Sequence, residues 1–299
     1  MKQYILIAIF ALSAIILRAQ DDLDALLDAE LSNTTEYAMG TFYSTRILNG
    51  HSVQMMPKGG LDFRVHHRFD NINTGYNRFW GIDGSYSYIS LEYGFTDKLM
   101  AGIGRQNDAF YNSYIKYSIL QQSKGVKNMP VSLVWVSTLG IDGYDYKGDE
   151  ARNNNFAGRL NYTHQLLIGR MFSPKLSLQL MPTYIHRNMV LNSNHKNDLW
   201  ALGIGGRYKI TNTFSVNAEY YYVNGNKNLP VGEKEYYNPI SLGVDIQVSG
   251  HVFQIMLTNC QSMIEHSMIG ETTGNIFKGD VRLGFNISQV FTIGGKKAQ

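Results

Sequence analysis

The chain has 299 residues, of which 44% are hydrophobic, 17% charged and 12% aromatic, and its formal net charge is +3. So many aromatic residues exclude a disordered chain, and the weak net charge gives no clustered basic face for a nucleic-acid partner. The single cysteine, Cys260, excludes an internal disulfide, a cysteine-rich zinc site and a haem attachment motif.

The first 19 residues have the pattern of a secretory signal peptide. Lys2 precedes an apolar run from Tyr4 to Leu17, and we expect cleavage after Ala19. A membrane anchor is the alternative, but this run is short for a spanning helix, and no later run approaches the roughly 20 residues required. No cysteine lies at the cleavage point, which excludes a lipoprotein. We therefore expect an exported mature chain.

Residues 20–59 form a segment distinct from the rest of the chain, and we expect a periplasmic N-terminal extension or plug. Leucines recur at helical spacing between Asp21 and Leu31 among acidic residues, which predicts a short amphipathic helix that could contact a periplasmic partner. Residues 41–48 and 51–56 then flank Asn49-Gly50, which predicts a hairpin with a type I′ turn. We expect this hairpin to lie against or inside the following domain, residues 60–299.

From residue 60 onward, apolar and polar residues alternate with a period of two. In one example Leu242, Val244 and Ile246 share one face, and Gly243, Asp245 and Gln247 share the other. A water-soluble β-sandwich would show the same alternation with its apolar face inward. Several segments, however, alternate for ten or more residues, which fits a tilted membrane strand of about 9–11 residues better than a sandwich strand of about 5–6. The pattern therefore favours a transmembrane barrel with its apolar face toward lipid.

The connections between these segments fall into two alternating classes. Three of them place three turn residues between two apolar residues, which we expect to pair across a hairpin, and Ser249-Gly250 is a shorter turn. The long polar connections are residues 70–84, 140–155, 224–238 and 261–278. Short turns on one rim and long loops on the other are typical of bacterial outer-membrane barrels.

The strand count is even, as a barrel with both termini on the short-turn rim requires. The fold class that we predict is all-β, a single antiparallel transmembrane barrel of about twelve strands, with fourteen as the alternative if the hairpin joins the sheet. The twelve segments are 60–69, 85–95, 98–106, 109–120, 130–139, 157–172, 175–190, 198–210, 213–223, 239–249, 251–259 and 279–292.

Short motifs spread over the mature chain resemble those of an uncharacterised family of bacterial outer-membrane β-barrels, a domain of unknown function. The resemblance implies a barrel in the outer membrane but brings no catalytic residue, ligand or substrate. The motifs include Asn49-Gly50-His51-Ser52, Leu61-Asp62-Phe63-Arg64, Leu91-Glu92-Tyr93-Gly94, His164-Gln165-Leu166, Gly206-Arg207-Tyr208, Ala218-Glu219-Tyr220-Tyr221 and Gly250-His251-Val252-Phe253-Gln254.

The histidines and glycines give no strong catalytic or metal signal. The strand register places His164 opposite Tyr184 on the outward face, where a His/Tyr pair suits the membrane interface. A lipid-facing Ser–His catalytic pair would need a serine opposite that histidine, and we expect none in this register. The glycines between Gly203 and Gly206 lie within a strand and open no helix, so they indicate a crowded lumen rather than a nucleotide loop. We expect no enzyme, metal or cofactor.

The charged residues that should face the lumen are the most informative set, and the basic ones outnumber the acidic ones. They would form either an eyelet for anionic solutes or a lumen closed by ion pairs. The candidates are Arg64, Arg68, Glu92, Lys116, Arg159, Arg187, Arg207, Lys209, Glu219, Asp245 and Arg282, together with Asp62.

Two functional hypotheses follow for a barrel in the outer membrane of a Gram-negative bacterium, surrounded by its lipid. The first is a narrow porin-like channel or uptake barrel for small polar or anionic solutes. The second is a non-conducting structural or partner-binding barrel.

Overall fold

The computed structural model describes residues 34–107, 109–143, 155–190, 194–224 and 235–293. The predicted signal peptide and the acidic helix between Asp21 and Leu31 lie outside this part of the chain. The chain divides into two units, residues 1–39 with 121–130 and residues 40–120 with 131–299. In the smaller unit β1 (Thr35–Tyr37) pairs antiparallel with β6 (Ser123–Gly125), a contact that the sequence did not predict.

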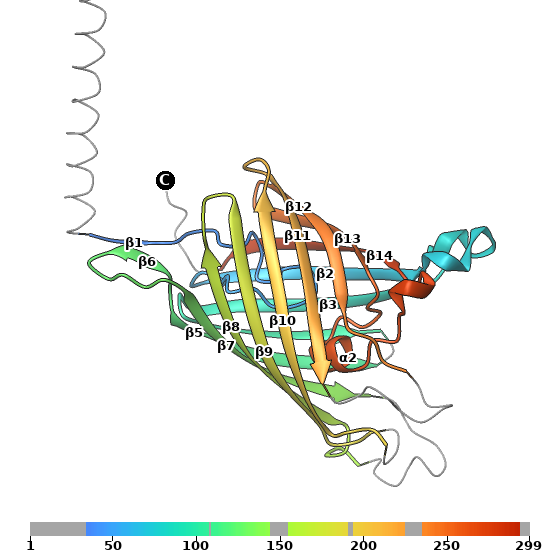
Figure 1. Ribbon diagram of the computed structural model, residues 1–299. Coiled ribbons are helices and arrows are strands. Elements are labelled where there is room, and N and C mark those ends of the chain that lie inside the picture. The colour runs from blue at the N-terminus through green and yellow to red at the C-terminus, as the bar shows by residue number, and fades with distance from the viewer. Residues whose placement is uncertain (1–33, 108, 144–154, 191–193, 225–234, 294–299) are drawn as a thin grey trace, which may run out of the picture. The chain divides into compact units, whose positions relative to one another are not determined.

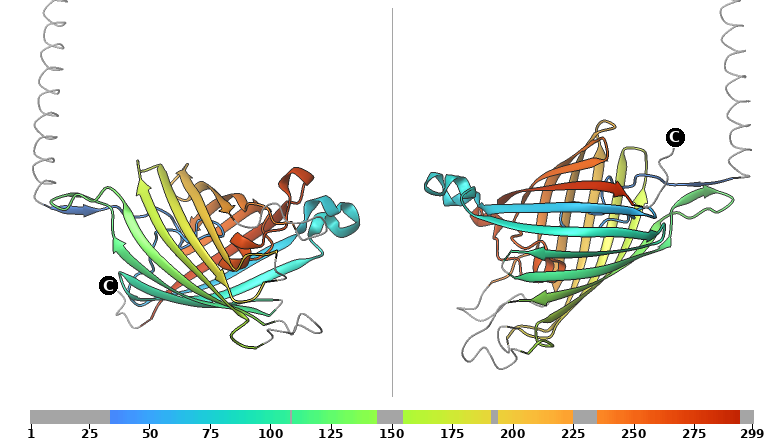
Figure 2. Two further views of the ribbon diagram at one scale, coloured as in Figure 1. Left: turned by 60° about the horizontal axis from the view of Figure 1, so that its bottom comes forward. Right: turned by 180° about the vertical axis from the view of Figure 1, so that it is seen from behind.

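The larger unit is a closed antiparallel barrel of twelve strands (Figures 1 and 2). This confirms the predicted all-β fold with twelve strands. Each strand pairs with the next barrel strand along the chain, and the last closes on the first. The strands are β2 (Gly60–Asn71), β3 (Ser85–Thr96), β4 (Leu99–Gln106), β5 (Phe110–Leu120), β7 (Ser132–Asp142), β8 (Leu160–Met171), β9 (Leu176–Arg187), β10 (Asp198–Lys209), β11 (Phe214–Asn224), β12 (Ile240–Val248), β13 (His251–Thr258) and β14 (Arg282–Thr292).

The alternation along each strand points the apolar side chains outward. In β12 the Leu242 side chain is 57% exposed, whereas Asp245 on the other face is 1% exposed. Aromatic side chains such as Trp200 and Phe95 are also outward and exposed. An apolar exterior around a polar interior is the arrangement that a barrel adopts when lipid replaces water outside it.

The predicted turns set the strand register. The main chain of Phe172 donates to Leu176 (2.9 Å) and that of Ile210 donates to Phe214 (3.0 Å), as the three-residue turn requires. The turn after Phe95 differs, because a register shift pairs Leu99 with Thr96. Ser249 and Gly250 both have positive φ, at 45° and 82°, so this two-residue connection has the backbone of a type I′ turn.

Residues 40–59, here called the plug segment, enter the barrel from the short-turn rim and return to it (Figure 1, blue). At one end the Tyr43 hydroxyl donates to the main chain of Asn212 (3.0 Å), which lies in a short turn. At the other end Gly59 donates to Gly94 near the end of β3 (2.8 Å). Ile47, Leu48 and their neighbours between these ends are fully buried. The plug segment adds no strand to the barrel, so the fourteen-strand alternative is wrong.

The predicted type I′ turn at Asn49-Gly50 is wrong. Ile47 N donates to Gly50 O (2.8 Å) and Ser52 N donates to Thr45 O (2.9 Å), so the chain reverses one residue earlier, at Leu48 and Asn49. None of Leu48, Asn49 and Gly50 has the positive φ that a type I′ turn needs. A different constraint selects Gly50, because a Cβ there would lie 2.0 Å from the Tyr221 hydroxyl oxygen.

A second segment enters the lumen from the opposite rim. The connection between β13 and β14 carries the short helix α2 (Glu265–Gly270), whose side chains are mostly buried (Figure 1). Its Met268 and Ile269 join one apolar cluster with Ile47 and Met56 of the plug segment. The same rim carries the 3₁₀ turns η1 (Ile72–Thr74), η2 (Tyr76–Gly81) and η4 (Ile276–Lys278). Among the described residues, no helix has the length and apolar character needed to cross a membrane.

Candidate functional site: the filled lumen

The barrel wall is shaped to receive the plug segment at close range. A Cβ added at Gly205 would lie 2.5 Å from Ile47 Cδ1, and one at Gly169 would lie 2.7 Å from Val53 Cγ2. The main-chain oxygen of Pro57 similarly occupies the space beside Gly94, where an added Cβ would lie 2.2 Å from it. These strands therefore place glycine where the plug segment touches them. The geometry agrees with the interpretation of residues 203–206 as a crowded stretch of wall.

Side-chain amides of the wall satisfy the main chain of the plug segment. Gln179 accepts from Val53 N (2.7 Å) and donates to His51 O (2.7 Å). Gln254 donates to Ile47 O and Asn286 to Leu48 O, both at 2.8 Å. A buried main-chain group without a partner costs as much as a lost hydrogen bond, so these amides allow irregular chain to lie inside the barrel.

Glu219 of β11 holds the tip of the plug segment. Its two carboxylate oxygens accept from the main-chain nitrogens of Asn49 (2.8 Å) and Gly50 (3.1 Å). The Asn49 side chain donates to Ser241 (2.7 Å) and accepts from Arg68 Nη2 (2.6 Å). The sequence predicted Glu219 and Arg68 as lumen-lining residues, and the structure brings both to the same tip.

A buried ion pair joins the plug segment to α2. Arg46 Nη1 lies 2.5 Å from Glu265 Oε1, and His51 Nε2 lies 3.0 Å from the same oxygen. The side chains of Arg46 and Glu265 are 1% and 0% exposed. Asn112 of β5 donates to the other oxygen of Glu265 (3.3 Å). The alternation pattern did not indicate Arg46, Glu265 or this role of His51, because none of them lies on a barrel strand.

The ionisation of this cluster follows from burial and from its charges. The pKa of His51 is lowered to about 4, because burial and then the Arg46 guanidinium disfavour its protonated form. Burial raises the pKa of the Glu265 carboxyl, but Arg46 and His51 lower this pKa by more than burial raises it. The carboxyl pKa therefore lies well below its usual range. Burial likewise lowers the pKa of Arg46 and Glu265 raises it by more. The cluster is thus a charged Arg46–Glu265 pair beside a neutral His51.

A second buried network lies on β2 and β3 beside this cluster. Arg64 Nη2 donates to Asp62 (2.6 Å) and to Thr45 Oγ1 of the plug segment (2.8 Å). Thr45 Oγ1 in turn donates to Glu92 Oε2 (2.6 Å). Two predicted lumenal residues, Arg64 and Glu92, therefore contact the plug segment rather than an open pore.

Two predicted lumenal cations hold main-chain oxygens of the plug segment. Lys116 Nζ donates to Gln54 O (2.6 Å) and to Thr45 O (3.3 Å). Arg207 Nη2 donates to Gly40 O (2.7 Å), and its guanidinium carbon lies 4.5 Å from the centre of the Tyr43 ring.

The other predicted lumenal residues lie nearer the rims or pair within the wall. Arg187 pairs with Glu271 (2.7 Å) and Arg282 with Asp70 (3.1 Å). Asp245 accepts from Gln254 (2.9 Å). Arg159 precedes β8 and Lys209 ends β10, and both are only partly buried. No cluster of three or more histidine, cysteine or acidic side chains that could hold a metal occurs in the described ranges.

Each buried basic side chain of the described lumen has an oxygen atom as its partner. The buried basic residues are Arg46, Arg64, Arg68, Lys116, Arg187, Arg207 and Arg282, and the buried acidic residues are Asp62, Glu92, Glu219, Asp245 and Glu265. The partly exposed Asp70 and Glu271 pair with two of the arginines. The predicted set lacked Arg46, Glu265 and Glu271, because it included only residues of the barrel strands.

The outward-facing histidines test two predictions, of which one is confirmed and one is wrong. His164 lies opposite Tyr184 in the register, as predicted, with the two rings stacked. The expectation of no outward serine beside His164 is wrong, because Ser137 of β7 lies directly opposite it and Ser137 Oγ is 3.0 Å from His164 Nδ1. The predicted register considered only β9 as the neighbour. His67 and Ser87 form a second pair at 3.0 Å, so the arrangement recurs as a cross-strand contact.

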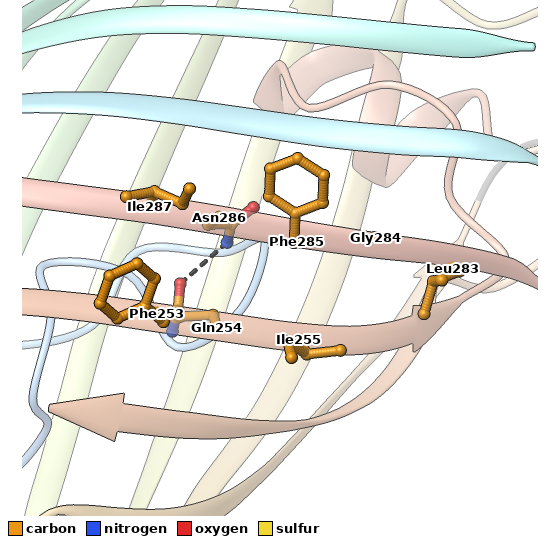
Figure 3. Close-up of a pocket in the computed structure, with 8 residues that line it drawn as sticks. All are labelled: Phe253, Gln254, Ile255, Leu283, Gly284, Phe285, Asn286 and Ile287. Carbon is orange, nitrogen blue, oxygen red and sulfur yellow. Dashed lines mark hydrogen bonds between the residues drawn. The ribbon is translucent and has the colours of Figure 1, made fainter. Parts of the chain in front are cut away.

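A hollow of about 300 Å³ lies on the outer face of β13 and β14 (Figure 3). Phe253, Ile255, Phe285 and Ile287 surround it, while Gln254 and Asn286 hydrogen-bond to each other below (2.8 Å). No charged group lines it, so this hollow is a dip in the apolar outer surface rather than a site for polar chemistry.

A family model described as a membrane bound beta barrel domain (DUF5777) matches residues 42–291, which confirms the resemblance seen in the sequence. Similar solved structures include the NanC porin (8% identity, TM-score 0.47, covering 78% of this chain and 98% of that chain). Others are the KdgM porin in complex with disordered oligogalacturonate (12%, 0.45, 78% and 99%) and LpxR from Salmonella typhimurium (11%, 0.38, 78% and 100%). No curated protein matches the chain.

Proposed function

The chain belongs to the DUF5777 family of membrane-bound β-barrel domains, and from this premise we propose that it is a closed, partner-binding barrel of a Gram-negative outer membrane. The short turns would face the periplasm and the long loops the cell exterior, as is usual for such barrels. The surrounding outer-membrane lipid would cover the apolar outer face.

The observation that carries this proposal is the fit of the plug segment. Wall glycines leave room for it, wall amides satisfy its main chain, and Glu219 holds its tip. An open eyelet would instead present charged side chains to water. Here Arg64, Lys116 and Arg207 donate their hydrogen bonds to the plug segment. The filled lumen therefore favours the non-conducting hypothesis over a steady channel.

The long-loop rim offers a surface for a partner. Tyr76, Phe79 and Trp80 of η2 are 78%, 55% and 53% exposed. Phe79 and Trp80 both have positive φ, at 46° and 50°, which is unusual for bulky residues and marks a strained, specific conformation. Exposed tyrosine and tryptophan side chains are enriched at protein interfaces. The acidic residues between Asp21 and Leu31 are a second proposed contact, for a periplasmic partner.

Planar-bilayer conductance tests the closed lumen. The mature chain, folded as shown by a heat-modifiable band, should give no steady current, whereas a variant lacking residues 41–56 should conduct. That variant is the matched control, since it keeps all twelve strands. A steady ohmic current from the intact chain would overturn the proposal.

A gated narrow channel for small anionic solutes is the second candidate. Lys116 and Arg207 are bound to carbonyl oxygens of the plug segment, so its departure would leave both cations facing the lumen. In the variant without residues 41–56, the current should then prefer anions. Arg207→Glu and Arg64→Glu should reduce that preference, and raised salt should weaken it by screening. Anion preference that survives both substitutions would contradict this candidate.

We propose no enzymatic activity. Ser137 and His164 are within hydrogen-bond distance, but the rings stacked on His164 in the described structure are those of Trp135 and Tyr184, which are aromatic rather than acidic. A catalytic pair needs a third group to orient the histidine. Hydrolysis of a fluorogenic phospholipid that Ser137→Ala abolishes would refute this view.

A further inference from the structure

Two segments from opposite rims of the barrel meet inside it. The plug segment enters from the short-turn rim, and α2 descends from the long-loop rim. Their charged contact is Arg46 with Glu265, and His51 shares the same carboxylate oxygen. We infer that this contact is a latch that couples the two rims, so that movement of the connection between β13 and β14 (residues 259–281, here called the α2 loop) loosens the plug segment. The inference rests on the proposed closed barrel and adds a conformational device to it.

Burial makes the loss of either partner of this ion pair costly. Both side chains are fully buried, so removing one charge leaves the other without solvent to stabilise it. Arg46 would keep a hydrogen bond to Asn49 O (3.1 Å), but its next carboxylate, Glu92, is 4.0 Å away. Lys116, a further cation near this cluster, points at carbonyl oxygens of the plug segment. Loss of Glu265 would therefore leave basic groups facing one another around the plug segment.

The α2 loop also has an anchor that does not touch the plug segment. Glu271, directly after α2, pairs with Arg187 of β9 at 2.7 Å. Breaking this pair removes one rim contact of the loop, beside those of Thr272 with Tyr237 and Gly274 with Asn259, and leaves the described contacts of residues 40–59 in place. Any effect of that change on the plug segment must then travel through α2. This separation makes coupling measurable.

Maleimide labelling of single cysteines reports each segment in the folded, membrane-inserted full chain. Ser52→Cys in a Cys260→Ser background reports the plug segment, because Ser52 is fully buried. The native Cys260, also fully buried in the connection that carries α2, reports the loop in the unmodified background. Low labelling rates are expected at both positions in the parent proteins.

The latch predicts a specific pattern of rates. Glu265→Gln should raise labelling of the plug reporter at least tenfold. Glu271→Gln should raise it severalfold alone but add nothing when Glu265→Gln is present, since the latch is then already broken. Because coupling is reciprocal, Arg46→Gln, which breaks the same ion pair from the side of the plug segment, should raise labelling of Cys260. Asp70→Asn is the matched control: it breaks the rim pair of Asp70 with Arg282 Nη1, leaves the hydrogen bond from Arg282 Nη2 to Gln261 of the α2 connection (3.1 Å), and should leave the plug reporter within twofold.

Three results would overturn the latch. The first is a labelling rate of Ser52→Cys that Glu265→Gln does not change, and the second is a rate that Asp70→Asn raises equally. The third is a double variant of Glu265→Gln and Glu271→Gln in which the two separate increases in rate multiply. If Glu265→Gln fails to fold, Asn112→Ala removes the weaker donor to Glu265 and should raise labelling in the same direction. A steady current from the intact chain would refute the closed barrel itself. A silent chain whose plug reporter ignores Glu265→Gln would refute only the latch.

Discussion

Gly50→Ala tests the seat of the plug segment at its tightest point. The added methyl carbon would lie 2.0 Å from Tyr221 Oη and 3.2 Å from Cζ of the same ring. Both distances are too short for carbon contacts, so either the tip withdraws or the Tyr221 ring moves. The ring has little freedom, since it is fully buried and its hydroxyl contacts Met181 Sδ (3.2 Å).

The cost depends on which group yields. Withdrawal of the tip would break the two main-chain hydrogen bonds to Glu219, and a hydrogen bond to a charged group contributes about 1.5–3 kcal/mol. A shift of the ring would instead cost what overpacking costs, about 1–3 kcal/mol. Breaking both bonds would cost more than moving the ring, and the protein takes the cheaper route, so we expect Gly50→Ala to lower the free energy of unfolding by about 1–3 kcal/mol.

Urea unfolding of the barrel folded in detergent or lipid, followed by tryptophan fluorescence, measures this free energy. Tyr221→Phe removes the hydroxyl oxygen that the methyl would strike. The double variant Gly50→Ala/Tyr221→Phe should recover more than half of the loss, and Tyr221→Phe alone should change little. If Gly50→Ala is as stable as the parent within about 0.5 kcal/mol, the tip does not sit against Tyr221 and the closed lumen loses its main support.

Three further predictions concern the same interior. Gly205→Ala should lower the free energy of unfolding by about 1–3 kcal/mol, because the added methyl group would overlap with Ile47 Cδ1. Ile47→Val removes that atom and should restore most of the loss. Equal losses with Ile47 and with Val at this position would refute the contact. Glu219→Gln should cost about 2 kcal/mol, because its amide group cannot accept from both main-chain nitrogens, and unchanged urea unfolding would refute that role. The folded-state pKa of His51, about 4, lies below the ordinary value of 6.5, so only the unfolded state takes up its proton between these values. Stability should therefore fall by up to about 3 kcal/mol as the pH drops from 6.5 to 4, and His51→Asn should flatten this slope in urea titrations at each pH.

The barrel itself was predictable because its determinants are local. Each strand shows the period-two pattern over its own length, and the turns carry the register between neighbours. Ile210 pairs with Phe214, as the three-residue turn predicts, and the register of the two strands that this turn joins continues from that pair. The end of β3 departed from the predicted register because a bulge at Phe95, between the pairs of Gly94 and Thr96, depends on contacts that the turn residues do not reveal.

The contacts inside the lumen were less predictable, because the residues that pair there are distant in sequence. Arg46 and Glu265 are 219 positions apart, and neither lies on a strand whose pattern would orient it. The pairing of β1 with β6 likewise joins residues that no local periodicity connects. Ser137 was missed for a simpler reason: the register between β7 and β8 crosses a long loop, so no turn specified it.

A polar inward face is ambiguous in sequence, because a water-filled pore and a protein-filled lumen both require it. Inward glycines distinguish the two cases. A pore wall gains nothing from an absent side chain, whereas a packed lumen needs space where another segment approaches. Gly169 and Gly205 face Val53 and Ile47 of the plug segment from two different strands, and Gly243 on a third strand approaches β13 and Leu48 alike. Contacts of this kind on separate strands indicate that the wall is built around its occupant, so the filled lumen is a property of the barrel sequence and not only of residues 40–59.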